Sequence, residues 1–213
     1  MSTVVKNTWV GAVPEHWNIT KLAHVAKIKT GGTPNRENLD YWTDGNIPWL
    51  ASGEVNKGVI TSVDNFITPL GMANSNATML PINTVMVALN GQGKTKGMAA
   101  LLKVPATCNQ SLAGIITDKK RLDPTYLYYY LQSKYSNIRG LKGEARDGLN
   151  LDIIGSIPVP LPRLDEQQDI VRQIEARITK LDTADAKLRD SIKLLEEYRS
   201  SLISNVVGGK VKV

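Results

Sequence analysis

The segment IPVPLPRLDEQQDIV, residues 157–171, joins two regions of the chain that follow different rules. Prolines stand at every second position of its first half, which excludes a helix and permits only an edge strand or an extended linker. Asp165 then offers an oxygen for a helix N-cap, and Gln168 three residues later completes a capping-box pattern. The segment therefore predicts an extended strand that leads directly into a helix.

One long helix is predicted downstream, because residues 166–207 contain neither proline nor glycine and Gly208-Gly209 follow them. A helix of about 42 residues, with a rise of ~1.5 Å per residue, is roughly 60 Å long. Along this helix, apolar residues recur at alternating intervals of three and four, as in a coiled coil, and form a stripe on one face. Two positions of the stripe carry charged residues instead. The positions of the stripe are Val171, Ile174, Ile178, Leu181, Asp185, Leu188, Ile192, Leu195, Arg199 and Leu202.

This stripe is too long to be buried on a domain of this size, and no other part of the chain has a matching pattern. We therefore expect antiparallel pairing with a helix of a second chain, either an identical copy or a relative. In an identical pair centred near Ile192, Asp185 of one helix would lie level with Arg199 of the other. The alternative is that both charged side chains extend past the apolar contact into solvent.

Residues 1–162 are interrupted every 8–15 residues by Gly, Pro or Asn, with short β-prone runs between them. This pattern predicts a mixed domain of short strands and long loops, so the expected class is α+β, with residues 163–213 as helix and tail. Asp123-Pro124 indicates the start of a helix that carries four tyrosines, and Asn150 indicates the cap of a shorter one. At helical spacing the tyrosines favour core packing over base stacking.

The net charge of +6 is concentrated in the first region, because residues 163–213 hold 10 basic and 9 acidic residues. This distribution favours a polyanionic partner for residues 1–162, although an ordinary basic surface explains it equally well. The single cysteine excludes an internal disulfide and indicates a reducing compartment, and two histidines make a zinc site improbable. No run approaches the 18 apolar residues of a membrane span, so we expect a cytoplasmic protein without a membrane partner.

Residues 88–95, ALNGQGKT, satisfy a relaxed phosphate-loop pattern. A nucleotide-binding loop also needs a full helix after it, and the seven residues before Pro105 allow about two turns at most. The same glycine-rich loop can follow a nucleic-acid backbone through Lys94 and Lys96. Asn90, Gln92 and Thr95 carry side chains able to hydrogen-bond to base edges. An ordinary solvated hairpin is the remaining interpretation.

Two further segments are candidates for nucleic-acid contact. Thr30, Thr33 and Arg36 flank the turn Gly31-Gly32-Thr33-Pro34, which is equally well explained as a structural turn. Arg146 lies in the polar loop before Asn150, where its guanidinium suits a guanine or a phosphate. The segment Asn109-Gln110-Ser111 either lines the same surface or pairs with buried backbone.

With these segments in place, the chain resembles one half of a specificity subunit of type I restriction–modification systems. The resemblance covers nearly the whole chain, and its most specific piece is the proline-rich strand before the Glu-Gln-Gln helix start. The matching segments are GAVPEHW (11–17), IKTGGTP (28–34), IPWLASGE (47–54), MLPINTVMVALNGQGKTKG (79–97), CNQS (108–111) and IPVPLPRLDEQQDIV (157–171).

The resemblance implies a target recognition domain whose loops approach the major groove of double-stranded DNA. It also implies a long helix that pairs antiparallel with another and docks methyltransferase subunits, with restriction/translocase subunits as further partners. Family members usually carry two recognition domains and two helices, whereas this chain has one of each. A homodimer reading a bipartite, palindromic site is therefore the expected arrangement.

Catalysis is not expected in this chain. It contains no Asn-Pro-Pro-Tyr or Asp-Pro-Pro-Tyr motif of the amino-methyltransferases and no GxGxxG loop, so no cofactor is expected and the methyl donor would be bound by the partner methyltransferase subunit. Two other classes stay open on sequence grounds. One is a nucleotide-binding enzyme, and the other is a coiled-coil scaffold whose basic domain has no ligand.

Overall fold

The structure of the protein is a computed structural model that describes residues 4–141 and 148–209. The chain divides into two units, residues 1–169 and residues 170–213. The first unit mixes strands and helices, and the second is helical, so the predicted α+β class is confirmed. The domain boundary placed after residue 162 stays a prediction.

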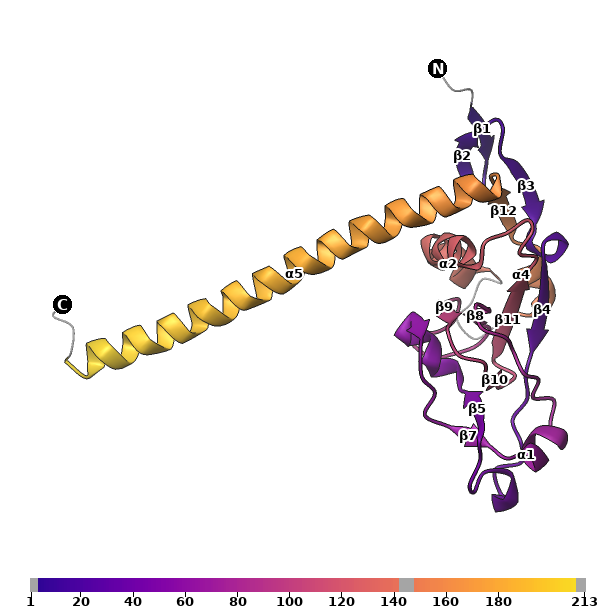
Figure 1. The fold of residues 1–213 in the computed structure, drawn as a ribbon, viewed down its shortest axis with the longest axis horizontal. Helices are drawn as coiled ribbons and strands as arrows, with labels where there is room; N and C mark the ends of the chain where they lie inside the picture. The colour runs from indigo at the N-terminus through magenta and orange to yellow at the C-terminus, as the bar shows by residue number, and fades with distance from the viewer. Residues whose placement is uncertain (1–3, 142–147, 210–213) are drawn as a thin grey trace. The chain divides into compact units, whose positions relative to one another are not determined.

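Most elements are short, as the spacing of Gly, Pro and Asn predicts, and one helix is much longer than the rest (Figure 1). The strands are β1 (Val4–Asn7), β2 (Gly11–Pro14), β3 (Asn18–Lys21), β4 (Ala26–Thr30), β5 (Ile47–Leu50), β6 (Val59–Ile60), β7 (Phe66–Ile67), β8 (Val85–Ala88), β9 (Ala99–Leu102), β10 (Thr107–Cys108), β11 (Leu112–Thr117) and β12 (Pro158–Leu161). The α-helices are α1 (Pro69–Ala73), α2 (Pro124–Ser133), α3 (Tyr135–Gly140), α4 (Leu151–Gly155) and α5 (Leu164–Val207), and the 3-10 helices are η1 (Leu22–His24), η2 (Leu39–Tyr41) and η3 (Ser52–Lys57).

A five-stranded sheet in the order β4-β11-β8-β9-β6 forms the centre of the first unit. Its neighbours are antiparallel except for β6 and β9, which run parallel. Every residue of β8 and β9 is buried, which fits strands covered on both faces. The helix α2 packs against these two strands, and a smaller sheet in the order β10-β5-β7 extends the core.

The predicted helix after Asp123 is confirmed as α2. The Asp123 carboxylate accepts hydrogen bonds from the backbone N–H groups of Thr125 (2.8 Å) and Tyr126 (2.9 Å). Core packing is confirmed for Tyr126 and Tyr128, which are buried, whereas Tyr129 and Tyr130 are partly buried. Tyr126 donates to the carbonyl of Pro160 at 3.0 Å and Tyr130 to that of Pro158 at 2.6 Å. Burial raises the pKa of both phenols.

The proline-rich segment forms β12, which pairs antiparallel with β3 in a separate two-stranded sheet. This confirms the expected edge strand, because proline lacks the N–H that a central strand must donate. The predicted start of the long helix is wrong by two residues. The helix α5 begins at Leu164, so Asp165 lies inside it, and its carboxylate accepts from the adjacent N–H of Glu166 at 3.0 Å.

The side chain that fixes the first turn of α5 is Gln167, which sequence reasoning passed over in favour of Gln168. The Gln167 amide is fully buried and accepts a hydrogen bond from the N–H of Asp123 at 2.8 Å. It donates to the carbonyls of Arg121 and Pro162, both at 2.9 Å. Glu166 adds a second contact, because Trp17 donates to its carboxylate at 2.9 Å.

We expect Gln167→Leu to lower the free energy of unfolding by about 2–3 kcal/mol, since it strands buried backbone groups that water no longer reaches. The control is Gln168→Leu, whose side chain is exposed and whose expected effect is within about 0.5 kcal/mol. Denaturant unfolding of both variants measures the difference. Equal stability of the two would show that the three hydrogen bonds contribute nothing net.

Within residues 4–141 and 148–209, no helix has the length and apolar character required to span a membrane.

Candidate nucleic-acid interface

The register of the central sheet brings three of the candidate segments to one end. Ala113 of β11 lies between Thr30 of β4 and Val87 of β8, and Val87 in turn pairs with Ala99 of β9. The chain therefore leaves β4 and β8, and enters β9 and β11, at the same end of the sheet (Figure 1). We call this the loop end, and it comprises residues 30–36, 89–98 and 109–111.

Residues 148–150 also reach the loop end. The N–H of Leu149 donates to the carbonyl of Leu89 at 2.9 Å. Gly148 lies so close to the Asn90 side chain that a Cβ at this position would overlap its carbonyl oxygen. Arg146, the candidate in the preceding loop, lies outside the described residues.

Residues 89–98 form the loop of a β-hairpin. The N–H of Gly97 donates to the carbonyl of Ala88 at 2.8 Å, and the N–H of Ala88 to that of Met98 at 3.0 Å, which closes the loop. Glycine is required at two positions inside it, because Gly93 has a φ of 59° and Gly97 a φ of 81°. The loop leads into the strand β9 rather than into a helix. The segment before Pro105, which could have held at most two helical turns, therefore lacks the helix that a bound nucleotide needs.

The loop exposes only some of the predicted contact side chains. Asn90, Gln92 and Lys94 are exposed and Thr95 is partly exposed. The expectation of two exposed cations is wrong for Lys96, which is only 3% exposed. Lys96 lies in the turn before β9, where Arg139 of α3 donates to its backbone carbonyl and so covers this part of the loop.

The helix α3 braces the hairpin loop from one side. Tyr135 donates its hydroxyl to the carbonyl of Lys94 at 2.7 Å, and Arg139 donates to that of Lys96 at 3.4 Å. The Arg139 backbone also lies 3.0 Å from the position of a Cβ on Gly97. Sequence reasoning missed both side chains, because no local pattern shows which loop a short helix will touch.

Thr30, Thr33 and Arg36 have unequal freedom to contact a ligand. The Thr30 hydroxyl donates to the carbonyl of Leu112 at 2.9 Å, so it is used to join β4 to β11. Thr33 donates to the side-chain carbonyl of Gln110 at 2.7 Å. Arg36 is exposed, and its guanidinium lies 5.3 Å from the ring centroid of Trp42 and 5.6 Å from that of Trp49. Such stacking orients a guanidinium without neutralising it.

Asn109 and Asn150 both organise backbone. The Asn109 side chain accepts from the N–H of Ser111 at 3.1 Å, and its own N–H donates to the carbonyl of Leu50 at 2.9 Å. This matches the interpretation in which Asn109 pairs with backbone rather than lining the surface. Asn150 caps α4 by accepting from the N–H of Ile153 at 2.9 Å, as predicted.

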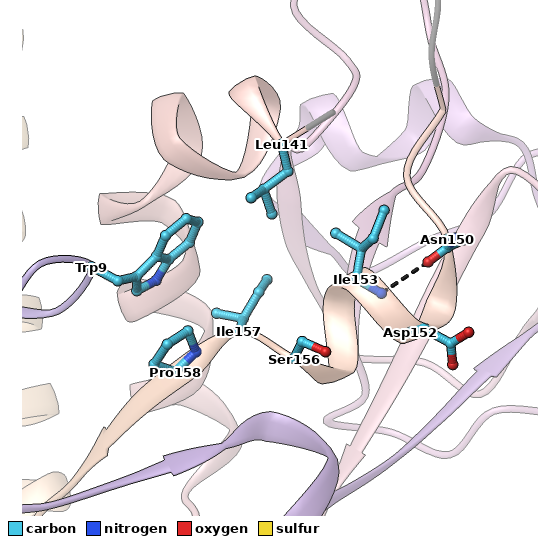
Figure 2. Close-up of a pocket in the computed structure, with 8 residues that line it drawn as sticks. All are labelled: Trp9, Leu141, Asn150, Asp152, Ile153, Ser156, Ile157 and Pro158. Atoms are coloured by element: carbon cyan, nitrogen blue, oxygen red, sulfur yellow. Dashed lines mark hydrogen bonds between the residues drawn. The ribbon is translucent and has the colours of Figure 1, made fainter. Parts of the chain in front are cut away.

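An apolar pocket of about 400 Å³ lies beside α4 (Figure 2). Figure 2 shows the side chains of Trp9, Leu141, Ile153 and Ile157 around one hollow, with the Asp152 carboxylate directed away from Trp9. The lining is mostly hydrocarbon, and its polar members are Asn150, Asp152 and Ser156. The Asn150 side chain is engaged in capping α4. Across the described ranges 4–141 and 148–209, His, Cys, Asp and Glu form no group of three that could hold a metal ion.

Comparison with known proteins gives one consistent family. The model of the type I restriction modification DNA specificity domain matches residues 14–194. The specificity subunit of the type I restriction enzyme EcoR124I/EcoR124II of Escherichia coli is 28% identical over 86% of this chain and 47% of its own length. That of StySPI from Salmonella potsdam is 21% identical over 93% of this chain and 44% of its own. The chain thus spans about half the length of these relatives.

Solved structures share the fold. The HsdS subunit from Thermoanaerobacter tengcongensis superposes with a TM-score of 0.61 at 19% identity, covering 81% of this chain and 40% of that one. A chain from a structural study of assembly and conformational transition in the type I R-M system gives 0.66 at 19% identity, covering 87% and 45%.

Proposed function

Because the chain belongs to the family of type I restriction modification DNA specificity domains, we propose that it recognises double-stranded DNA and carries out no catalysis itself. Its relatives are specificity subunits of type I restriction enzymes. In this proposal the loop end contacts the bases, and partner subunits supply methylation. The complex acts in the cytoplasm. Restriction/translocase subunits are further partners of the same assembly.

The observation that carries the proposal is the convergence of the candidate segments at the loop end. Gln92 and Lys94 project from a hairpin closed by backbone hydrogen bonds, and Arg36 is held at the same end by two tryptophan rings. Cations suit phosphate contacts and amide side chains suit base edges, so one surface offers both kinds. Thr95 lies in the same loop, whereas the buried Lys96 is left out of the contact set.

The second part of the proposal is a homodimer formed through α5. At 44 residues and roughly 66 Å, this helix exposes the apolar positions of the predicted stripe from Ile178 onward, including Leu181 (68%), Leu188 (64%) and Leu195 (66%). Val171 and Ile174 are half-buried. Burial of such side chains against an antiparallel copy is strongly favourable in water. A two-fold dimer would read two inverted half-sites separated by a fixed spacer, and the paired helices would position methyltransferase subunits.

The proposed contact between Asp185 and Arg199 of two chains has a competitor within the helix. Asp185 accepts from the guanidinium of Arg189 at 2.7 Å, one turn away. Exposed pairs at this spacing contribute about 0.3–0.5 kcal/mol. An interchain pair between Asp185 and Arg199 would therefore have to replace only this weak contact within the helix. In the alternative arrangement, both charged side chains extend into solvent.

Two single variants test the loop end. Lys94→Ala is expected to weaken binding on every duplex and to lower the salt slope by about one, because one phosphate contact is lost. Gln92→Ala is expected to relax discrimination at one base position and to leave the salt slope unchanged. Equilibrium binding at several salt concentrations, with the methyltransferase subunits present, measures both effects.

The control for Lys94 is Lys103→Ala. Lys103 is also exposed, but it follows the opposite end of β9 and donates to the Asn83 side chain at 3.1 Å. It should leave affinity and salt slope unchanged. If Lys94→Ala and Gln92→Ala both bind matched and mismatched duplexes like the unaltered protein, the hairpin loop is not part of the interface. A scaffold function would instead give no duplex binding at all.

A further inference from the structure

We propose that a polar cleft next to the hairpin loop is a second base-reading element, and that it recognises the major-groove edge of an adenine. The cleft has a volume of about 570 Å³ and is lined by the segments 31–33 and 73–76 together with Gln110. This inference rests on the proposed DNA-recognition function. It adds Asn76 to the contact residues that sequence patterns indicated, and it gives Gln110, within the candidate segment 109–111, a specific role.

The floor of the cleft is rigid backbone. The N–H of Gly32 donates to the carbonyl of Cys108 at 2.9 Å, and the indole N–H of the buried Trp49 donates to the carbonyl of Gly32 at 2.9 Å. A Cβ on Gly32 would meet the backbone nitrogen of Asn76 at 2.7 Å. Two chain segments are thus pressed together here with no side chain between them, which holds the groups above them in fixed positions.

The walls of the cleft offer neutral amide and hydroxyl groups. Gln110 and Asn76 are exposed, and Gln110 is oriented by the 2.7 Å hydrogen bond from Thr33 to its carbonyl oxygen. Asn74 is partly committed, because its amide donates to the carbonyl of Leu70 at 2.9 Å. The Asn76 side chain is exposed where it lines the cleft. Asn and Gln amides are the side chains that pair with the N6 and N7 atoms of adenine through two hydrogen bonds.

The position of the cleft connects it to the hairpin loop. Leu112 pairs with Ala88 in the sheet, and the N–H of Leu89 donates to the carbonyl of Ser111 at 2.9 Å. Asn90 follows Leu89 and Gln110 precedes Ser111, so these two residues continue the paired strands outward from the sheet. A duplex that lies against Gln92 and Lys94 therefore has the cleft beside it, and a neutral amide-lined cleft suits a base edge better than a phosphate.

The test is selection of bound duplexes from a randomised double-stranded DNA library. The protein is used together with its methyltransferase subunits, unaltered or carrying Asn76→Ala, Gln110→Ala or the control Asn18→Ala. Asn18 is an exposed asparagine on β3, outside the loop end. The two cleft variants should lower the preference for adenine by about 5- to 100-fold at one position, or two adjacent ones, in each half-site. The salt slope should stay unchanged because no charge is altered.

A third variant, Asn76→Asp, should shift the preference at the same position from adenine toward cytosine, since a carboxylate accepts from the cytosine amino group. Recovery of the unaltered motif by all three cleft variants would overturn the cleft proposal and leave the proposed function standing. Failure of the unaltered complex to enrich any sequence would overturn both. Thermal melting confirms that the variants are folded, and a loss of preference equal to that of Asn18→Ala counts against the cleft.

Discussion

Replacing Leu188, Ile192 and Leu195 together with Asp is expected to convert the protein from a dimer into a monomer. All three side chains are exposed on α5, at 64%, 57% and 66%, and they lie on the predicted stripe. Each substitution removes about 1.5–3 kcal/mol of favourable free energy from burial of an apolar side chain in the dimer. A dimer of the variant would in addition have to bury charges along the contact. We expect the dissociation constant to rise by more than about 10³-fold. Analytical ultracentrifugation across a range of concentrations measures this directly.

The control carries the same three added charges on another face of the helix, as Ala176→Asp, Thr183→Asp and Ser201→Asp. These positions are exposed and lie outside the stripe. This variant should remain a dimer, because its apolar stripe is intact. A stable monomer for the unaltered chain, with or without methyltransferase subunits, would contradict the dimer. So would equal weakening by both triple variants, because the stripe would then have no particular role.

Gly31→Ala is expected to lower the free energy of unfolding by about 4 kcal/mol or more. A Cβ at Gly31 would overlap the backbone carbonyl of Cys108 and come within 2.9 Å of its Sγ atom. Backbone cannot rotate away as a side-chain end can, so the segments on either side of the cleft floor must separate. Gly53→Ala is the matched control, because nothing lies within 4 Å of its Cβ position.

The reactivity of the Cys108 thiol reports this change. Cys108 is buried, and burial raises the pKa of its thiol to about 12. A thiol reagent at pH 8 should therefore modify the unaltered protein and Gly53→Ala very slowly, since only the thiolate reacts. Gly31→Ala should react much faster and unfold at lower denaturant concentration. Equal labelling rates and equal unfolding midpoints for the two glycine variants would contradict the close packing at the cleft floor.

The elements that the sequence predicted well are those governed by local chemistry. Asp123 and Asn150 cap helices, and the prolines of β12 hold it at an edge, because the partner groups lie within a few residues. The start of α5 was placed two residues late because Asp165 is a good cap in isolation. The deciding contact, from Gln167 to Asp123, joins residues 44 positions apart.

The candidate site shows the same division. Glycine and lysine in residues 89–98 indicated an exposed loop, but Lys96 is buried where α3 packs against the loop, a contact remote in sequence. The Asn109 side chain makes a local contact with the N–H of Ser111, whereas the backbone bond that fixes this segment goes to Leu50, which is remote in sequence. Thr33 and Gln110 lay in candidate segments, but the cleft itself was not predicted, because its walls come from three segments that meet only in the folded chain. No sequence pattern marked Asn76 or Gln110 as neighbours.

The proposal that two copies of this chain read one split DNA site is tested by sequencing the methylated sites in cells that express the chain with its methyltransferase subunits. We expect a motif of two identical, inverted half-sites separated by a spacer of constant length. A single undivided motif, two unrelated half-sites, or methylation without sequence preference would contradict it.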